Sequence, residues 1–204
     1  ITNLQLYIEA IKDGVIDVDD QTLSSLLEET QRLEGLVVNL NKSFNDNSEY
    51  LKINKKEFDL SQHIKLILDT IKPRLTKLDI SLIEEIKDGV LIYSDKDKIS
   101  QIIQNLISNA IKAIKEDGLI RVSLYEDKNN IYIDIKDNGV GISDEKKEVI
   151  FERFYRIDDA RNTKTNGHGL GLSITKNFVE SLRGKIKLKS KLGKGSTFSV
   201  IFPK

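Results

Sequence analysis

The stretch "IYIDIKDNGVGIS", residues Ile131 to Ser143, decides how this chain folds, because a strand pattern runs directly into a glycine-rich end. Its isoleucines alternate with polar residues, which places them on one side of a β-strand. Asp137 is next in the same row, where a carboxylate is unfavourable unless a hydrogen-bond donor reaches it. Gly139 and Gly141 follow at once. The pattern therefore predicts a strand that ends at a binding site.

The letters "DNG" at the end of this strand have two interpretations. Asn-Gly is common in hairpin turns, but a hairpin needs a second strand next. The following segment, "SDEKKEVIFERF", instead predicts a capped helix with acidic residues in its first turn. We therefore favour a site in which Asp137 accepts a hydrogen bond from the exocyclic amine of adenine. Gly139 and Gly141 would let a flat base lie close to the backbone.

The composition limits the classes of function. The chain has 204 residues, of which 39% are hydrophobic and 31% charged, and its formal net charge is zero. Neutrality argues against a nucleic-acid partner, because nucleic-acid-binding proteins usually show a basic excess. The chain has no cysteine, which fits a reducing compartment. It shows no long apolar run and no signal peptide. Because it starts at Ile1 rather than at a methionine, we expect a fragment or a processed product.

Residues 1–47 predict a helical hairpin. Apolar residues recur every three or four positions on both sides of "KDGVIDVDD", where Gly14 ends one helix and Asp19 or Asp20 caps the next. The second helix has a heptad seam. So narrow a pair cannot bury its seam alone, and we expect a dimeric four-helix bundle. A helical cap packed on the next domain is the alternative. The polar segment "NDNSEY" marks the boundary to a second domain, residues 48–204.

Residues 48–204 predict an α+β sandwich, in which helices cover one face of a single mixed sheet. We expect one helix capped by Ser61 that runs through Leu75 with a kink at Pro73, a second over Asp95 to Lys115, and a third after Gly171. The expected hairpins join "ISLIEEI" with "VLIY", "LIRVSLYED" with "NIYIDIKD", and "KIKLKS" with "STFSVIF".

The helix expected over 95–115 has a polar line beside its isoleucine stripe. Asn105, Asn109 and Lys112 stand at i, i+4 and i+7, so they share one face. Asparagine is a poor helix former, so two on one line need a reason. A carbonyl oxygen can bind Mg²⁺, and a lysine one turn on can reach the phosphates that Mg²⁺ bridges. The alternative is a solvated polar face.

The stretch "NGHGLGLSITK", Asn166 to Lys176, places Gly167, Gly169 and Gly171 before a helix. Backbone N–H groups at such a helix start, together with the helix dipole, favour an anion such as phosphate. The pattern differs from a Walker loop, because no GK[ST] follows, and it lacks the βαβ context of a dinucleotide fold.

The segment between "IFERF" and these glycines is polar. We expect Phe151 and Phe154 to pack in the core. Arg156 begins a run that contains Arg161 and Lys164, which is either a lid with cations facing phosphate or an ordinary solvated loop.

The two histidines, His63 and His168, are not expected to act as metal ligands or nucleophiles. We place His63 at the surface of a helix. His168 lies among the glycines, without the cysteine, histidine or carboxylate neighbours of a metal site.

The order of these motifs resembles a known family. "QNLISNAIKA", "DNGVGI", "FERFYR", "GHGLGLSI" and "GKGSTFSVIFP" are similar to the N, G1, F, G2 and G3 boxes of sensor histidine kinases. The catalytic domain of these kinases has the GHKL (Bergerat) α/β sandwich fold, and the resemblance covers residues from Ser48 to the C-terminus. Less specifically, residues 1–47 resemble the dimerisation and histidine-phosphotransfer hairpin of the same family.

The resemblance implies an ATP·Mg²⁺ site that draws on all of these boxes. It implies that Asn109 binds Mg²⁺ with support from Asn105, and that Lys112 and Arg156 contact phosphate. Asp137 would recognise adenine, with Gly139 and Gly141 shaping the pocket. Further nucleotide contacts would come from the second glycine-rich stretch, which contains Gly167, His168, Gly169, Leu170 and Gly171. His168 replaces the usual Thr or Ser, which we expect to be tolerated because the backbone N–H does the work.

The resemblance also implies an activity and its partners. The parent protein would transfer the γ-phosphate of ATP to a histidine, for relay to the aspartate of a response-regulator receiver domain. It would form a homodimer through its N-terminal helices and lie at the cytoplasmic side of the cell membrane, attached only through segments upstream. In the family the acceptor histidine precedes a segment resembling "ITNLQLYIEAI". We therefore expect this fragment to bind ATP·Mg²⁺ without autophosphorylating.

Two other functions fit parts of the pattern. An ATPase of the gyrase, Hsp90 or mismatch-repair type would have a glutamate as general base one turn before the metal-binding asparagine. Asn105 stands at that position here, so hydrolysis should be slow. A scaffold that binds nucleotide without catalysis is the second alternative.

Overall fold

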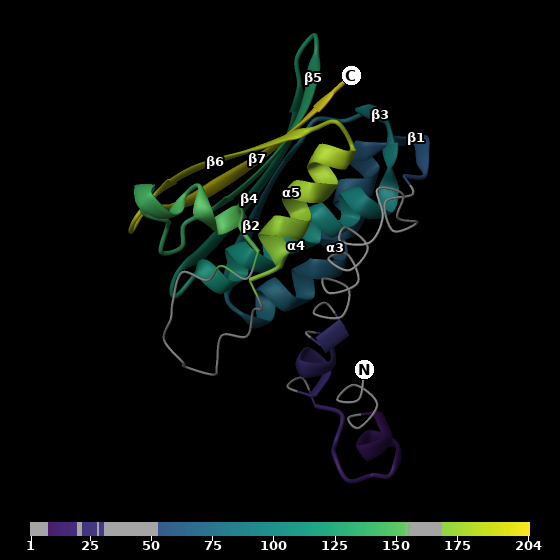
Figure 1. Ribbon diagram of the computed structural model, residues 1–204, viewed down its shortest axis with the longest axis vertical. Coiled ribbons are helices and arrows are strands. Elements are labelled where there is room, and N and C mark those ends of the chain that lie inside the picture. Colours follow the sequence, from purple (N-terminus) through teal and green to yellow (C-terminus); the bar gives the residue numbers. More distant parts are fainter. Residues whose placement is uncertain (1–7, 20–21, 28, 31–52, 154, 156–168) are drawn as a thin grey trace.

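A five-stranded mixed sheet with helices on one face forms the body of residues 53–204 (Figure 1). The computed structural model describes residues 8–19, 22–27, 29–30, 53–153, 155 and 169–204. The elements are β1 (Lys55–Asp59), α3 (Leu60–Lys77), β2 (Ile80–Ile86), β3 (Leu91–Asp95), α4 (Lys96–Ala113), β4 (Gly118–Glu126), β5 (Asn130–Asp137), the 3₁₀ turns η2 (Asp144–Lys146) and η3 (Val149–Phe151), α5 (Gly171–Ser181), β6 (Lys185–Lys191) and β7 (Gly195–Pro203).

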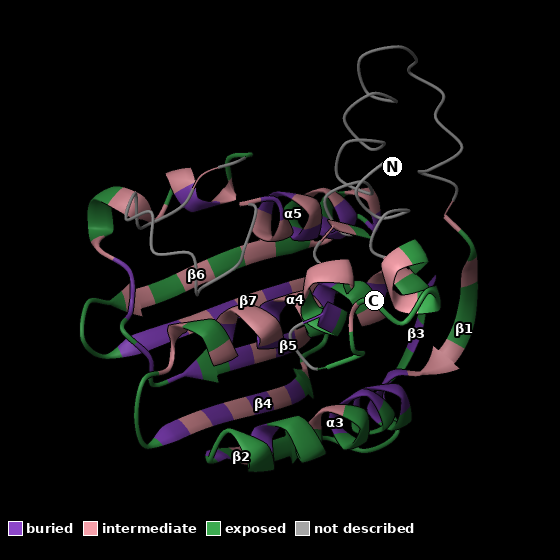
Figure 2. Ribbon diagram, turned by 90° about the horizontal axis from the view of Figure 1, so that it is seen from below, coloured by how far each residue is buried: buried purple, intermediate pink, exposed green. Residues whose placement is uncertain are grey.

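The strand order of the large sheet is β2-β4-β5-β7-β6, and Figure 2 shows β4, β5, β7 and β6 side by side. Only β2 and β4 are parallel; the other neighbouring pairs are antiparallel. The predicted hairpins β4–β5 and β6–β7 are confirmed, and so is the prediction of an α+β fold with helices on one face of a mixed sheet. β1 and β3 form a separate two-stranded antiparallel sheet.

The predicted hairpin of "ISLIEEI" with "VLIY" is wrong. β2 pairs with β4, starting at Ile80 opposite Gly118, whereas β3 pairs with β1. The turn between β2 and β3 is tied to α3, because the Ser61 hydroxyl donates to Lys87 O at 2.7 Å and accepts from Val90 N at 3.0 Å. These bonds direct the chain away from the large sheet. Alternation of apolar and polar residues predicts a strand, but it does not predict which other strand that strand pairs with.

Two aspartates start the long helices. Asp59 caps α3 by accepting from Gln62 N at 2.9 Å, so the cap is not the predicted Ser61. The helix continues through Pro73 to Lys77. Asp95, predicted as the first residue of a helix that runs to Lys115, is instead the cap of α4, and its carboxylate accepts from the backbone N–H of the second and third helical residues, each at 3.1 Å.

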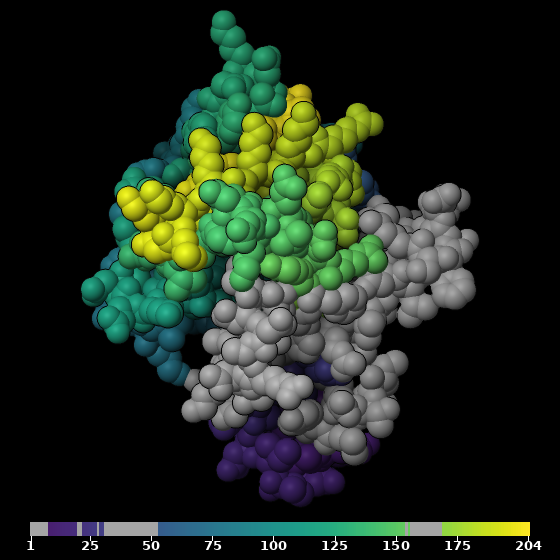
Figure 3. All heavy atoms as spheres, turned by 60° about the vertical axis from the view of Figure 1, so that its left-hand side comes forward, coloured from purple at the N-terminus to yellow at the C-terminus, as the bar shows by residue number. Residues whose placement is uncertain are grey.

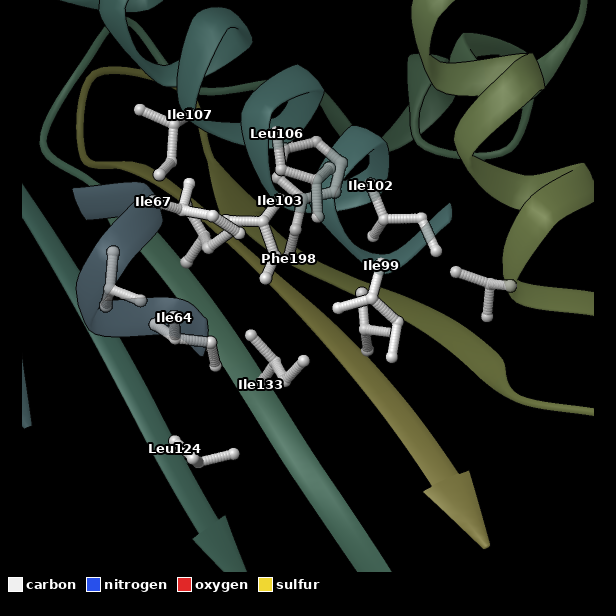
Figure 4. Close-up of a cluster of buried hydrophobic side chains, with 14 of the residues drawn as sticks. Ile64, Ile67, Ile99, Ile102, Ile103, Leu106, Ile107, Leu124, Ile133 and Phe198 are labelled. Carbon is white, nitrogen blue, oxygen red and sulfur yellow. The ribbon is translucent and has the colours of Figure 1, made fainter. Parts of the chain in front are cut away.

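The core lies between the helices and the sheet (Figure 4). The predicted apolar stripe of α4 is buried, and its side chains meet Ile64 and Ile67 of α3 on one side and Leu124, Ile133 and Phe198 of the sheet on the other. This burial holds α4 in one orientation, with its polar line turned away from the sheet. The buried stripe consists of Ile99, Ile102, Ile103, Leu106, Ile107 and Ala110.

The helix predicted after Ser143 is wrong. The chain makes two short 3₁₀ turns there, η2 and η3, and no side-chain cap bond starts η2. The segment has a run of charged residues before "VIF", and only Ile150 of η3 is buried. So few apolar residues provide no stripe along which a longer helix could pack.

The N-terminal hairpin is only partly covered by the described residues. Helical residues 8–12 precede Gly14, whose φ of +69° ends that helix, and Asp19 accepts from Thr22 N at 2.7 Å as a cap for residues 22–27. Residues 31–47 and the "NDNSEY" boundary lie outside the described residues, so the hairpin, the four-helix bundle and the domain boundary stay predictions. No helix among the described residues is both long and apolar enough to span a membrane.

The loop after β5 is fixed by backbone contacts at Gly141. This residue has φ +69°, a conformation that L side chains rarely adopt, and a Cβ placed on it would collide with the carbonyl oxygen of Lys191. Beside it, Gly193 N donates to Val140 O at 2.7 Å. The loop therefore lies directly against the β6–β7 turn.

We expect Gly141→Ala to lower the free energy of unfolding by roughly 2–5 kcal/mol. About 1–2 kcal/mol comes from a left-handed non-glycine residue and about 1–3 kcal/mol from overpacking against Lys191. Urea denaturation measures the loss. Gly193→Ala is the matched control, because Gly193 has φ +75° but open space around its Cβ position, so only the first contribution applies. Equal losses in the two variants would contradict the collision.

Candidate functional site

Asp137, the last residue of β5, is a buried carboxylate at the edge of the core. It is 3% exposed, and Oδ1 accepts from Gly139 N at 2.8 Å and from Ser196 N at 3.3 Å. Burial raises the pKa of this carboxyl above its ordinary value, although the two backbone bonds act in the opposite direction. Both of these bonds end on Oδ1, so Oδ2 is the oxygen available to a ligand donor.

The backbone around Asp137 is packed closely. In the sheet register Asp137 lies opposite Ile120 of β4 and Ser196 of β7. A Cβ on Gly195 would collide with the carbonyl oxygen of Asp137, and a Cβ on Gly139 would lie 2.5 Å from Ala113 O. Gly139 and Gly141, predicted to make room for a base, are thus also required by contacts within the protein itself.

A serine pair behind Asp137 was missed from the sequence. The Ser190 hydroxyl accepts from Ile142 N at 2.8 Å and lies 2.9 Å from Gly195 O and 3.0 Å from the Ser196 hydroxyl. Ser190 follows Ile186 and Leu188 in the inward row of β6. A polar residue in that row is the same anomaly that marks Asp137, and it could have been found in the same way.

Asn105, on the polar line of α4, holds α5 in place. Its Nδ2 donates to the carbonyl oxygen of Gly171 and, at 2.6 Å, to the Thr175 hydroxyl. A Cβ on Gly171 would lie 2.5 Å from Asn105 Oδ1, so glycine permits this close approach. Asn105 therefore ties α4 to α5.

Asn109 lies one turn further along α4 and is half-buried. Its Nδ2 is buried and has no hydrogen-bond partner among the described residues. An unpaired buried amide is uncommon in folded proteins and needs an explanation. A bound phosphate or metal-bound water would satisfy it, while the amide oxygen could bind Mg²⁺. The donor set at this position therefore fits the predicted role.

The end of α4 carries both the loop after β5 and Lys112. Val140 N donates to Ala113 O at 3.0 Å, which joins the loop to the last residue of the helix. Lys112, one turn after Asn109, is exposed. α4 thus brings its own polar line close to the loop that begins at Asp137.

Among the described residues, no side chain caps the start of α5. Its N-cap position, Leu170, makes no side-chain cap bond, and Gly169 before it has φ +69°. Leu170 itself is 5% exposed, so its side chain packs inward and only its backbone faces the approach to the helix. Free N–H groups at such a terminus favour an anion. Arg156, Gly167 and His168, predicted to belong here, lie outside the described residues.

Two other predictions concern aromatic residues. Phe151 packs as expected, edge-to-face against Phe198 with ring centroids 6.4 Å apart; Phe154 lies outside the described residues. His63 was placed at the surface, and this is wrong. It is 8% exposed and its Nε2 lies 2.8 Å from the Ser100 hydroxyl of α4, where burial lowers its pKa. The α3 face that carries it is covered by α4, which the helical period alone does not reveal.

Comparison with known proteins adds to this geometry. Residues 94–204, a segment longer than half of the chain, match the family described as histidine kinase-, DNA gyrase B-, and HSP90-like ATPase. The sensor protein kinase WalK of Staphylococcus aureus is 36% identical over 211 residues, an alignment that covers 100% of this chain and 50% of that protein. For WalK of strain JH9 the covered share is 34%. The chain thus spans half or less of the length of these curated relatives.

Solved structures of histidine kinases share the fold. The catalytic domain of ThkA matches with a TM-score of 0.65 at 27% identity, covering 74% of this chain and 98% of that one. ThkA has also been solved in complex with the response regulator protein TrrA. The Acinetobacter baumannii kinase AdeS matches with a TM-score of 0.68 at 26% identity, covering 99% and 93% of the two chains. On these grounds the chain belongs to the family of histidine kinase-, DNA gyrase B- and HSP90-like ATPases, as a catalytic domain of the sensor histidine kinase kind.

Proposed function

We propose that residues 48–204 bind ATP with Mg²⁺ and transfer its γ-phosphate to a histidine, for relay to the aspartate of a response regulator. The observation that carries the proposal is the buried carboxylate of Asp137. Its position at a strand end, beside Gly139 and Gly141, gives a flat ring a hydrogen-bond acceptor in an apolar setting.

Asp137 favours adenine over other bases for a chemical reason. The exocyclic amine of adenine is a donor, and Oδ2 is the acceptor that faces it in this proposal. Guanine presents a carbonyl oxygen at the same place on the ring, and two acceptors repel each other. Because the site is buried, the mismatch would leave a carboxylate without a donor, which is strongly unfavourable.

The phosphates are proposed to lie between α4 and α5. Asn109 would bind Mg²⁺, Lys112 would contact phosphate, and the backbone at Gly169 to Gly171 would donate to phosphate oxygens. When bound, Mg²⁺ neutralises charge on the phosphates. Arg156, Gly167 and His168 are proposed to complete the site over the phosphates.

Transfer to a protein is favoured over hydrolysis by water. In the related ATPases a glutamate activates water, but here Asn105 occupies the position, has no basic group and donates to Gly171 and Thr175. The same comparison disfavours a gyrase-, Hsp90- or mismatch-repair-type ATPase. A scaffold that binds no nucleotide is disfavoured by the buried Nδ2 of Asn109, which has no partner among the described residues and lies where a metal ligand is expected.

The acceptor histidine is proposed to lie outside these 204 residues. His63 is buried and bonded between α3 and α4, so it cannot present a nitrogen to a nucleotide without unpacking the core. The complex of ThkA with TrrA supports a response-regulator receiver domain as partner. A homodimer through residues 1–47 and a parent protein at the cytoplasmic side of the membrane belong to the same proposal.

We expect Asp137→Asn to weaken ATP binding by at least about tenfold, since a hydrogen bond to a charged group contributes about 1.5–3 kcal/mol. The Gly139 and Ser196 N–H groups would hold the amide oxygen in the place of Oδ1. The amide nitrogen would then face the adenine amine, donor against donor. Isothermal titration with ATP measures the loss. Unchanged affinity would remove the basis of the adenine proposal.

The free energy of unfolding of Asp137→Asn, measured as a function of pH, is the control that the variant is folded. Because burial raises the pKa of Asp137 in the folded state, the ionised carboxylate destabilises the fold above its ordinary pKa of 3.8. Wild type therefore loses stability as the pH rises through the folded-state pKa, and the asparagine variant does not. The free energy of unfolding of the Asp137→Asn variant should therefore exceed that of the wild type by more at pH 7 than below pH 3.8.

The two asparagines of α4 should behave differently when changed to alanine. We expect Asn109→Ala to weaken ATP binding by about tenfold or more with Mg²⁺ present and little in EDTA, at almost unchanged stability. Asn105→Ala should lower the free energy of unfolding by about 1–3 kcal/mol, because it removes two hydrogen bonds to α5. The exposed Gln104→Ala is the control on the same helix. Equal loss of binding with and without Mg²⁺ in Asn109→Ala would exclude metal ligation.

Radiolabelled ATP tests the proposed acceptor. We expect no acid-labile phosphate on these 204 residues alone, and label on a separately added dimerisation domain that carries an acceptor histidine. Acid-labile label that disappears in His168→Ala would show that the acceptor lies within this chain.

A further inference from the structure

The edge strand β6 has lysine at every second position. Its sequence is "KIKLKSK", and Lys185, Lys187, Lys189 and Lys191 are all exposed. In the described part of the chain, β6 is the last strand of the large sheet and pairs only with β7. The row of β6 side chains stands out from the surface in Figure 3.

The register places these lysines on the sheet face opposite the helices. Lys185, Lys187 and Lys189 lie opposite Ile201, Ser199 and Thr197 of β7, and directly opposed residues of an antiparallel pair share a face. The intervening β7 residues, Phe198, Val200 and Phe202, are buried in the core on the other face. Figure 1 shows the helices on that core side only.

Within the described part of the chain, Lys185, Lys187 and Lys189 have no carboxylate partner. None of the ion pairs between described residues includes Lys185, Lys187 or Lys189. Their cross-strand neighbours on β7 are uncharged, although the chain has as many acidic as basic residues. Like charges at alternate positions are about 7 Å apart and repel.

Edge protection explains only part of this pattern. Lysine on an edge strand discourages pairing with another strand, which limits aggregation. A single charge in mid-strand serves that purpose, whereas β6 has a cation at every outward position. Lysine is also depleted in strands. The lysines of β6 recur at every second residue, which is also the spacing of the side chains on one face of a strand that would pair with the β6 edge.

The geometry points to strand addition at β6 by an extended acidic segment of a partner protein. Backbone hydrogen bonds along the open edge would provide affinity. Acidic side chains at alternate positions would lie opposite Lys185, Lys187 and Lys189 and provide selectivity. A neutral or basic strand would gain no such pairs, so the same lysines that exclude other strands admit an acidic one. Lys185, Lys187 and Lys189 lie on the opposite face of β6 from Ser190, the residue that contacts the loop after Asp137. The inference does not depend on the proposed function.

Fluorescence anisotropy with a labelled peptide of alternating glutamate and threonine, as long as β6, tests the proposal on the whole chain. We expect binding that weakens as salt is raised. The triple variant Lys185→Glu, Lys187→Glu, Lys189→Glu should lose at least about tenfold in affinity for this peptide and gain affinity for a lysine–threonine peptide. The matched control reverses exposed lysines elsewhere, Lys12→Glu, Lys56→Glu and Lys128→Glu, and should bind like the unchanged chain.

Two further probes decide between strand addition and a diffuse charge effect. A peptide N-methylated at every backbone nitrogen cannot donate the edge hydrogen bonds from either side, and we expect it not to bind. Equal binding of the methylated peptide, or equal weakening in the control triple variant, would overturn the proposal. Binding to phosphatidylserine vesicles without binding to the peptide would overturn it in favour of a lipid surface.

Discussion

The site depends on one constraint, which is the burial of a carboxylate where a row of isoleucines ends. The N–H groups of Gly139 and Ser196 offset part of the cost of burying Asp137. The backbone approaches closely here, because a Cβ on Gly195 would collide with Asp137 O and one on Gly139 with Ala113 O at the end of α4. An acceptor held so rigidly in an apolar place is preorganised for a ligand donor.

α4 joins the core to the site. Its isoleucine stripe is buried between α3 and the sheet, and this burial fixes the direction in which its asparagines point. The two asparagines then have separate tasks, although they are one turn apart. Asn105 is saturated by α5, whereas the amide nitrogen of Asn109 has no partner among the described residues. Because α5 begins where Asn105 binds it, the packing of two helices sets the position of the N-terminus of α5.

Local sequence patterns predicted many of the strands and helices, whereas contacts between residues distant in the sequence could not be predicted. The hairpins β4–β5 and β6–β7 follow from alternation, and the row containing Asp137 follows from the same rule. β2 was paired wrongly because its partner β4 lies beyond α4 in the chain, and no residue in β2 encodes that distance. His63 was misplaced because a helix shows its apolar side in the sequence but not how much of the remainder a neighbour covers. The bonds of Asn105 and Ser61 depend on tertiary contacts in the same way.

The parallel pairing of β2 with β4 has a consequence for how the molecule assembles. Hairpins of the sheet can form by short-range closure, but β2 can join only after β3 and α4 have crossed over to return the chain to the sheet. Closing so long a connection loses more chain entropy than closing a tight turn, and contacts distant in sequence slow folding. The two later hairpins, β4–β5 and β6–β7, are therefore suited to act as the template, and the first strand of the large sheet in chain order is among the last to dock.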